Sequence, residues 1–276
     1  MNSRERVKTV FERSGTPDRV PLQFDLCRQL TDQFGKKYNI PIHYTTSYFE
    51  DVTYRISANE LRTAMGSDCV IVGGSLPRGY SHPVPKEGQI INEFGMLMEQ
   101  GSLYMETIEA PLKDATMVQD VLNHPVPDPY APGRFDDAIK YTAMYKDDYY
   151  IIGDLELTMF EMSWHQVGLA KFMMDMALQE DYIFTLIDRV KEFSIGIARQ
   201  LVEVGVDAIW FGDDFGAQKN MLISPRMWRK HFKPRYAELW QEVKALNPDI
   251  IIAYHTDGAV SPILGDLAEI GMNVFN

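Results

Sequence analysis

The sequence has few cysteines and no long apolar run. Its two cysteines, Cys27 and Cys69, do not form a CxxC pair, so the chain offers neither a disulfide framework nor a cysteine zinc knuckle. No apolar stretch approaches the roughly 18 residues that a membrane span needs, and the first residues are charged, unlike a signal peptide. We therefore expect a cytoplasmic protein without a membrane partner.

Basic residues are also scarce. The chain has 27 Lys and Arg against 39 Asp and Glu, a formal net charge of −12. Proteins that bind nucleic acid use a surplus of Lys and Arg to contact phosphates. The balance therefore argues against a nucleic-acid partner and for a small-molecule substrate. The 276 residues, 45% of them hydrophobic, suffice for a large core, and one domain over residues 1–276 is the simplest organisation.

Short apolar runs alternate along the chain with segments of helical periodicity. The runs with the character of buried strands are residues 20–25, 68–73, 149–154, 206–212, 250–254 and 273–275. We expect a first helix that begins with Ser3 as its N-cap and, after it, helices near 27–38, 134–146, 160–179, 182–204, 225–246 and 260–270. Ser224 and Pro225 are suited to the N-cap and the first position of one of these helices. Residues 89–109 alternate between apolar and polar types and predict an antiparallel hairpin.

The unbroken alternation of strands and helices predicts an α/β fold. Parallel strands with right-handed crossovers follow from that order, and polar residues recur where the strands end, as at the catalytic face of a TIM-type (β/α)8 barrel. An eight-unit barrel averages about 30 residues a unit, and only six strands are visible. We therefore expect a barrel truncated after about six units, with its C-terminal units missing. A second chain, in a homodimer, is one way to cover the unpaired strand edges.

Two adjacent carboxylates follow the strand at 206–212. Asp213 and Asp214 lie in the loop Gly212-Asp213-Asp214-Phe215-Gly216-Ala217-Gln218, which a barrel would place at its mouth. Such a pair could bind a cation, orient a base or stabilise positive charge. The alternative is that one acid caps a neighbouring helix while the other faces solvent. We assign Asp213 and Asp214 to the catalytic site and Gln218 to substrate binding.

His255 ends the strand at 250–254, and Asp257 follows two residues later. A histidine and an aspartate at this spacing could ligate a metal or act as an acid/base pair. A lone histidine is more often structural, but the position at a strand end and the following Gly258 favour a site. We therefore predict a catalytic and metal-binding role for His255 and Asp257.

Three further residues follow predicted strands and could contact a substrate. Asp25 closes the run at 20–25, Glu156 comes two residues after Asp154 at the end of the run at 149–154, and Trp164 could stack on a ligand. For the acids the alternative is an interaction with a helix dipole. We assign Asp25, Glu156 and Trp164 to substrate binding.

Three motifs occur together in a fixed order. They are Ser3-Arg4-Glu5-Arg6-Val7 with Pro17-Asp18-Arg19-Val20-Pro21, then the GDDFGAQ loop with Ile223-Ser224-Pro225, then His255-Thr256-Asp257-Gly258. In this order the chain resembles the uroporphyrinogen decarboxylase-like superfamily, and within it the corrinoid-dependent methyltransferase branch. The resemblance covers essentially the whole chain. It implies an α/β barrel, in agreement with the order of the elements.

The motifs also bear on which branch of the superfamily the chain resembles. Decarboxylases of uroporphyrinogen carry an arginine-rich segment after strand one and an aspartate at the end of strand two. Here only Arg28 remains in the first segment, and Gly73 and Gly74 stand at the second. The methyltransferase branch holds zinc with a His-x-Cys pair and a later cysteine. His255 matches the histidine, and Asp257 stands where the first cysteine belongs, which would make a zinc site less thiophilic.

Three functions therefore stay open. The resemblance implies methyl transfer between a small methylated compound or a thiol acceptor and a corrinoid or corrinoid protein, with His255 and Asp257 at a zinc ion and Asp213 or Asp214 organising the pocket. The alternative is cofactor-independent decarboxylation of uroporphyrinogen or another carboxylate. The third function is that of a non-catalytic ligand-binding barrel or an inactive fragment.

Overall fold

The computed structural model describes residues 1–45, 47 and 55–276. Its strands are β1 (Cys69–Val72), β2 (Gln89–Ile91), β3 (Leu97–Gln100), β4 (Met105–Glu109), β5 (Tyr150–Glu156), β6 (Ala208–Gly212), β7 (Ile251–His255) and β8 (Val274–Phe275). Its helices are α1 (Ser3–Phe11), α2 (Arg28–Tyr38), α4 (Asn59–Ala64), α5 (Val118–Asn123), α6 (Asp136–Tyr145), α7 (Phe160–Val167), α8 (Leu169–Leu178), α9 (Asp181–Val204), α10 (Pro225–His231), α11 (Lys233–Leu246) and α12 (Leu264–Glu269), with a 3-10 turn, η1 (Ser261–Ile263).

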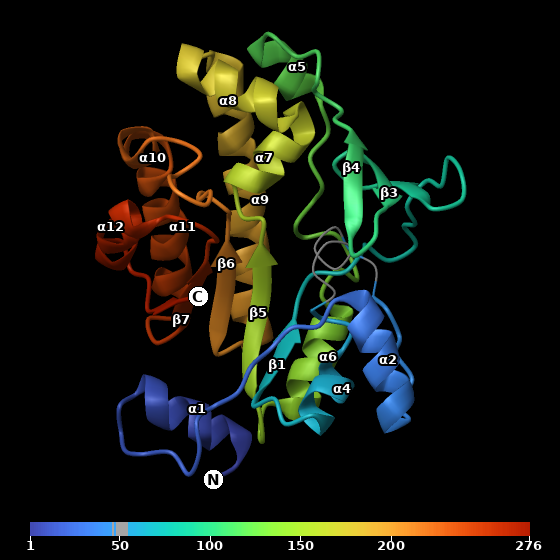
Figure 1. Cartoon of the computed structure of the whole chain (residues 1–276), viewed down its shortest axis with the longest axis vertical. Helices are drawn as coiled ribbons and strands as arrows, with labels where there is room; N and C mark the ends of the chain where they lie inside the picture. The colour runs from blue at the N-terminus through green and yellow to red at the C-terminus, as the bar shows by residue number, and fades with distance from the viewer. Residues whose placement is uncertain (46, 48–54) are drawn as a thin grey trace.

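The centre of the molecule is a parallel five-stranded sheet. Its strand order is β1-β5-β6-β7-β8, and every neighbouring pair is parallel. Figure 1 shows β1, β5 and β6 side by side, with α9 and α11 behind or beside them and α1 at the end of the sheet near the N-terminus. The predicted α/β fold with parallel strands and intervening helices is therefore confirmed. The sheet ends at β1 on one edge and at β8 on the other.

The two faces of this sheet have different partners. One face carries Ile151, Ile209, Phe211 and Ile252 into the main hydrophobic core, where they meet the helices. The opposite face, which we call the inner face, carries a smaller apolar cluster near the amino ends of the strands: Val7, Ile56, Cys69, Ile71, Tyr150, Ile152 and Ala208. Because side chains alternate along a strand, Asp154 and Glu156 continue the inner face of β5 toward its carboxyl end.

The segment between residues 89 and 109 forms a separate antiparallel sheet in the order β2-β3-β4. The predicted hairpin is present as β3 and β4, which pair on either side of Gly101. A second turn, with Gly95 at a φ of 77°, lets β2 pair with β3 as well. The structure thus has one strand more here than the predicted hairpin.

The predicted strand at residues 20–25 was wrong. The segment is extended, but Leu22 donates its backbone N–H to the Asp68 carboxylate at 2.8 Å instead of to a strand. Pro21 has no N–H to donate, and Val20 is 82% exposed. Among the described residues, the Leu22 carbonyl is the one in this segment that accepts from the backbone, from Asp68 at 2.7 Å, so no ladder to a described strand forms.

Several helices begin or end at other residues than predicted. The first helix is capped by Asn2 and not by Ser3, because Asn2 accepts from the Glu5 N–H at 2.8 Å and Glu5 accepts in return from the Asn2 N–H at 3.0 Å. The helix expected over 160–179 is divided at Gly168, which has a φ of 96°. The helix expected over 225–246 is divided at Phe232, because a proline follows in the first turn of α11. The N-cap at Ser224 is confirmed, since its side chain accepts from the Met227 N–H.

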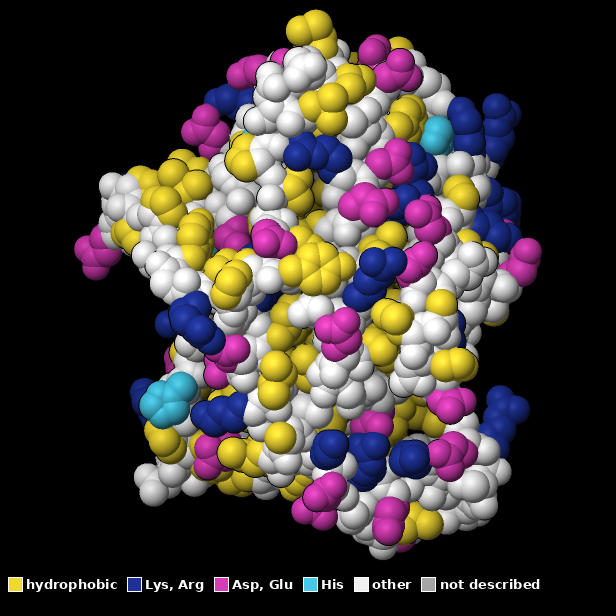
Figure 2. All heavy atoms as spheres, turned by 180° about the vertical axis from the view of Figure 1, so that it is seen from behind, with side chains coloured by type: hydrophobic (Ala, Val, Ile, Leu, Met, Phe, Trp, Pro, Cys, Tyr) yellow, Lys and Arg dark blue, Asp and Glu magenta, His cyan; other side chains and the backbone are white. Residues whose placement is uncertain are grey.

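The surface mixes both signs of charge. In Figure 2, acidic and basic side chains are interspersed with apolar ones over the face opposite to that of Figure 1. None of the helices in the described part of the chain combines the length and the apolar character that a membrane crossing requires.

Candidate active site

Glu156, Gly212 and His255 lie side by side at the carboxyl ends of three neighbouring strands. The register pairs Glu156 of β5 with Gly212 of β6, and Gly212 with His255 of β7. A Cβ atom on Gly212 would lie 2.9 Å from the Glu156 Cγ and 3.3 Å from the His255 Cβ. Because Gly212 has no side chain, the Glu156 Oε1 comes within 3.8 Å of the His255 Nε2 across the middle strand.

Two more carboxylates reach the same histidine. The His255 Nε2 lies 3.7 Å from the Asp214 Oδ1 and 3.8 Å from the Asp257 Oδ1. One ligand atom from each of Asp214, His255 and Asp257 lies within 4.8 Å of the others. The Asp257 side chain is 78% exposed, so this cluster opens to solvent. The structure thus brings together His255, Asp257 and Asp214, and a metal-binding role for them stays a prediction.

The orientation of His255 is fixed by its second ring nitrogen. Nδ1 is 2.8 Å from the Asn276 Oδ1, which can only accept, so Nδ1 carries the proton and donates it. The Nε2 lone pair then faces the three carboxylates, in the arrangement by which proteins present a histidine to a metal ion. Asn276 was not among the predicted site residues, because a single asparagine outside any motif gives no signal in the sequence.

Asp213 lies away from this cluster. It is fully buried and accepts hydrogen bonds from the backbone N–H groups of Met159, Phe160 and Glu161 at 2.8, 2.9 and 2.9 Å. The Tyr236 hydroxyl donates to it as well. These contacts agree with the alternative interpretation of the sequence, in which one of the two acids caps a neighbouring helix. Asp213 attaches the start of α7 to the end of β6.

Glu161 lies between Asp213, which caps α7, and Asp214 of the cluster around His255. Its carboxylate accepts from the Asp214 N–H at 3.0 Å, and it is adjacent to Asp213. Burial raises the pKa of Glu161, and the negative charges of Asp213 and Asp214 raise it further. Burial also raises the pKa of Asp213, but the Tyr236 hydroxyl and three backbone donors oppose that effect. As the pH falls, Glu161 therefore binds a proton before Asp213 does.

Two arginines that the sequence analysis did not single out enter the site. Arg55 Nε and Arg62 Nη1 each lie 3.0 Å from a different oxygen of Asp25. Arg55 also forms an ion pair with Glu156 and places its guanidinium 5.5 Å from the centre of the Trp210 ring. Asp25, predicted as a substrate contact, is thus held by two cations. Neither arginine lies in a recognisable motif, so only the folded chain could reveal them.

Asp154 is a second buried acid of this region. It lies two residues before Glu156 on the inner face of β5 and is 1% exposed. Among the described residues neither of its oxygens has a hydrogen-bond partner, although the Arg55 Nη1 lies 3.5 Å from Oδ1. Burial raises the pKa of Asp154 to about 6.

The remaining predicted contacts lie apart from the cluster. Trp164 stacks on His165 of the same helix, with ring centres 3.7 Å apart, and packs against the main core. Gln218 is exposed on the loop after β6. Within the described ranges no hydrogen bond or ring contact joins either residue to Glu156 or His255, so their role as substrate contacts stays a prediction.

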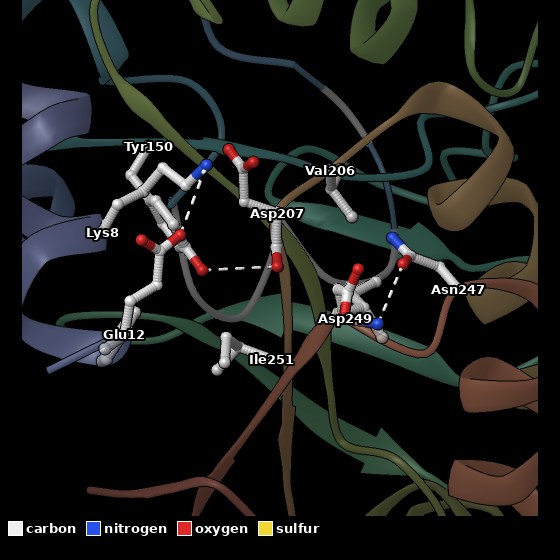
Figure 3. Close-up of a pocket in the computed structure, with 10 residues that line it drawn as sticks. Lys8, Glu12, Tyr150, Val206, Asp207, Asn247, Asp249 and Ile251 are labelled. Atoms are coloured by element: carbon white, nitrogen blue, oxygen red, sulfur yellow. Dashed lines mark hydrogen bonds and ion pairs between the residues drawn. The ribbon is translucent and has the colours of Figure 1, made fainter. Parts of the chain in front are cut away.

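A separate cavity of about 340 Å³ lies at the opposite end of the sheet. Figure 3 shows it between α1 and the amino ends of β6 and β7, with Lys8 paired to Glu12 and the Tyr150 hydroxyl donating to the Asp207 carbonyl. Enzymes with β/α barrels carry their active sites at the carboxyl ends of the strands. We therefore place the candidate active site at Glu156, Asp214, His255 and Asp257 and not in this cavity.

Comparisons with known proteins agree with this fold. A family model described as uroporphyrinogen decarboxylase (URO-D) matches residues 107–276, more than half of the chain. A solved methyltransferase from Methanosarcina mazei matches 100% of this chain and 75% of its own length, with a TM-score of 0.66 and 21% identity. A cyclic alpha-maltosyl-(1→6)-maltose hydrolase from Arthrobacter globiformis covers 68% of this chain and 51% of its own at a TM-score of 0.27 and 10% identity, too little similarity to support a shared fold. No curated protein matches the chain in sequence.

Proposed function

Because the chain belongs to the uroporphyrinogen decarboxylase (URO-D) family, we propose that it is a metal-dependent enzyme of this family that transfers a methyl group between a corrinoid and a small acceptor or donor. The observation that carries the proposal is the convergence of Asp214, His255 and Asp257 on one point at the carboxyl end of the sheet. The structural relative from Methanosarcina mazei bears the name of a methyltransferase, and the proposed reaction class agrees with that name.

The residues of the cluster fit a divalent cation. An imidazole nitrogen and two carboxylate oxygens are a donor set that zinc accepts, and the hydrogen bond from His255 to Asn276 leaves Nε2 available. Asp214, His255 and Asp257 would hold the ion. A bound zinc ion would lower the pKa of an acceptor thiol and so supply a thiolate at neutral pH. With two carboxylates in place of thiolates, the site favours harder cations than a cysteine-rich site does.

The chain's own residues arrange the pocket around that ion. Asn276 orients the His255 ring, and the Asp257 N–H, 2.8 Å from the Asp214 Oδ1, fixes the first carboxylate. Arg55 holds Glu156 by an ion pair beside the histidine. Asp213 keeps α7, which carries Glu161, against the end of β6.

Methyl transfer can be tested with the purified chain, methylcobalamin and a panel of thiols, while the absorption spectrum of the corrinoid is followed. We expect a spectral change that depends on added zinc and is lost in His255→Ala. His43→Ala, which removes an exposed imidazole, serves as the matched control and should keep the activity. A spectrum that stays constant with every acceptor would count against the proposal.

Decarboxylation of a porphyrin is less well supported by the site. That reaction needs cationic side chains for the substrate carboxylates, and the two arginines near the site, Arg55 and Arg62, already bind Asp25. Incubation with uroporphyrinogen followed by chromatography distinguishes the two reactions. We expect no loss of carboxyl groups.

A further inference from the structure

The inner face of the sheet carries an apolar groove near the amino ends of the strands. The groove has a volume of about 320 Å³, and its walls are α1, residues 20–23 and inner side chains of the strands. None of the described residues that line it is Asp, Glu, Lys, Arg or His. Because 24% of the chain is charged, this lining has the composition of a core and not that of the surrounding surface.

The apolar side chains on the rim of this groove are exposed. Val20 is 82% exposed, Leu22 and Phe275 are each 43% exposed, and Val10 and Phe11 of α1 are exposed as well. In Figure 1 the helices α9 and α11 lie behind or beside the strands, so they do not cover the inner face. Exposed apolar side chains gathered around one groove mark a surface that another molecule covers.

An open strand edge borders the same groove. β8 is the last strand of the parallel sheet, and its residues Val274 and Phe275 both line the groove. In a closed β/α barrel the inner side chains of all strands pack against one another in layers, and no strand edge is left. Among the described residues this sheet ends at β8, so its apolar layers end in the open groove. The inner face therefore combines an apolar surface with a free strand edge, and chains associate through such edges.

The exposure of the rim distinguishes between a small ligand and a larger partner. Ligand pockets enclose most of the surface of the bound molecule and have volumes of about 300–1,000 Å³, so this groove is at the lower limit. A small molecule that filled it would leave Val20 and Phe275 in contact with water. A protein surface would cover the groove and its rim together.

The charge of the chain favours a second copy as this partner. Each chain carries a formal net charge of −12, so two copies repel each other over most of their surface. Two copies that meet at the groove bring no like charges into direct contact, because the lining is uncharged. A second copy also presents apolar side chains and a strand edge of the same kind, and in a twofold dimer both chains use the same surface.

We propose that two copies of this chain associate through their inner faces, with the rim of each copy packed against the groove of the other. This interface does not depend on the proposed methyl transfer. The groove reaches the candidate active site, because two of its lining residues, Trp210 and Asn276, contact His255. The Trp210 ring is stacked on the His255 ring with centres 6.5 Å apart. The second copy therefore shields the inner side of His255 from water.

The test is sedimentation velocity of the full chain over a hundredfold range of micromolar concentrations. We expect a reversible equilibrium between monomer and dimer. Val20→Asp should raise the dissociation constant at least tenfold, because it places a charge in the contact, and it should spare the monomer, in which Val20 is exposed. Val84→Asp adds the same charge at another exposed valine, which does not line the groove, and should leave the dissociation constant unchanged.

Hydrogen exchange measured by mass spectrometry locates the contact on the unmodified chain, and it decides the question if Val20→Asp does not fold. We expect the backbone amides of residues 20–23 and 274–276 to exchange more slowly at concentrations at which the dimer dominates.

Three results would overturn the proposal: a monomer at every concentration, a dimer without this protection, or a dimer of full affinity in Val20→Asp. A monomer that binds an anilinonaphthalene sulfonate dye, and loses the dye in Val20→Asp, would also overturn it and would assign the groove to a small apolar ligand.

Discussion

Asp154 is a charged residue that is buried. The sign of its effect on the free energy of unfolding follows from its pKa. An aspartic acid whose pKa is about 6 in the folded chain, against an ordinary 3.8, binds its proton more tightly when folded. The charged form therefore destabilises the fold at pH values above about 6, and this destabilisation fades as the pH falls toward 3.8. Arg55 and Arg62 oppose the effect, while Asp25 adds to it.

We predict that Asp154→Asn makes the chain more stable at pH 8 by up to about 3 kcal/mol, the free-energy equivalent of that difference in pKa. The gain should shrink as the pH is lowered and disappear near pH 4. Urea unfolding of both proteins between pH 4 and 8 measures it. A constant difference across this range, or a loss of stability at pH 8, would contradict the raised pKa of Asp154.

At the scale of the elements, the site depends on how closely β5 and β7 approach across β6. Gly212 is the residue that permits this approach, since a Cβ atom there would meet both Glu156 and His255. The strands themselves are fixed by their register and by the apolar residues on their other face, so the side chains at this point have little room to move.

We predict that Gly212→Ala weakens metal binding about tenfold or more, as changes around metal ligands do, and costs about 1–3 kcal/mol of stability through overpacking. Calorimetric titration with zinc and chemical denaturation give the two quantities. Gly265→Ala is the control, because a Cβ there meets no atom within 4 Å and the position is helical. It should leave metal affinity unchanged. Wild-type zinc affinity in Gly212→Ala would show that Glu156 and His255 need not be so close.

At the scale of the whole molecule, charged residues attach the N-terminal segment to the amino end of the sheet. Asp68 is fully buried just before β1 and pairs with Arg6 of α1 at 2.6 Å and with Arg19 at 2.7 Å. Burial opposes its ionisation, but the Leu22 N–H and the two guanidinium groups together lower its pKa. The stabilisation by Asp68 is therefore complete at neutral pH and is lost as the pH falls below 3.8 toward its folded value.

We predict that Asp68→Asn costs about 1–3 kcal/mol at pH 7, because Arg6 and Arg19 lose a charged acceptor while Arg6 keeps Asp18, and that it exposes residues 1–27 to limited proteolysis. Mass spectrometry of the first cleavage products and denaturant unfolding test both effects. Asp136→Asn, which breaks the exposed pair with Arg78, should change neither. If the first cleavage in Asp68→Asn occurs outside residues 1–27, Asp68 does not anchor this segment.

The sequence by itself determined the α/β order, the five strands of the parallel sheet and the positions of His255 and the Asp213–Asp214 pair at strand ends. These features follow from local periodicity and from the rule that polar residues after parallel strands gather at one edge. The incorrect prediction of a strand at residues 20–25 shows the limit of that reasoning, because the composition of this segment suits a strand. The Leu22 N–H donates to a carboxylate instead of to a neighbouring strand, and Pro21 has no N–H.

Only the tertiary structure decided which of the acids face the site. Asp213 and Asp214 are adjacent in sequence, yet one caps α7 and the other lies beside His255. Arg55 and Arg62 reach Asp25 across 30 and 37 residues of chain, and Glu156 meets His255 across β6. Such contacts depend on strand register and long-range packing, which leave no periodic trace in the sequence.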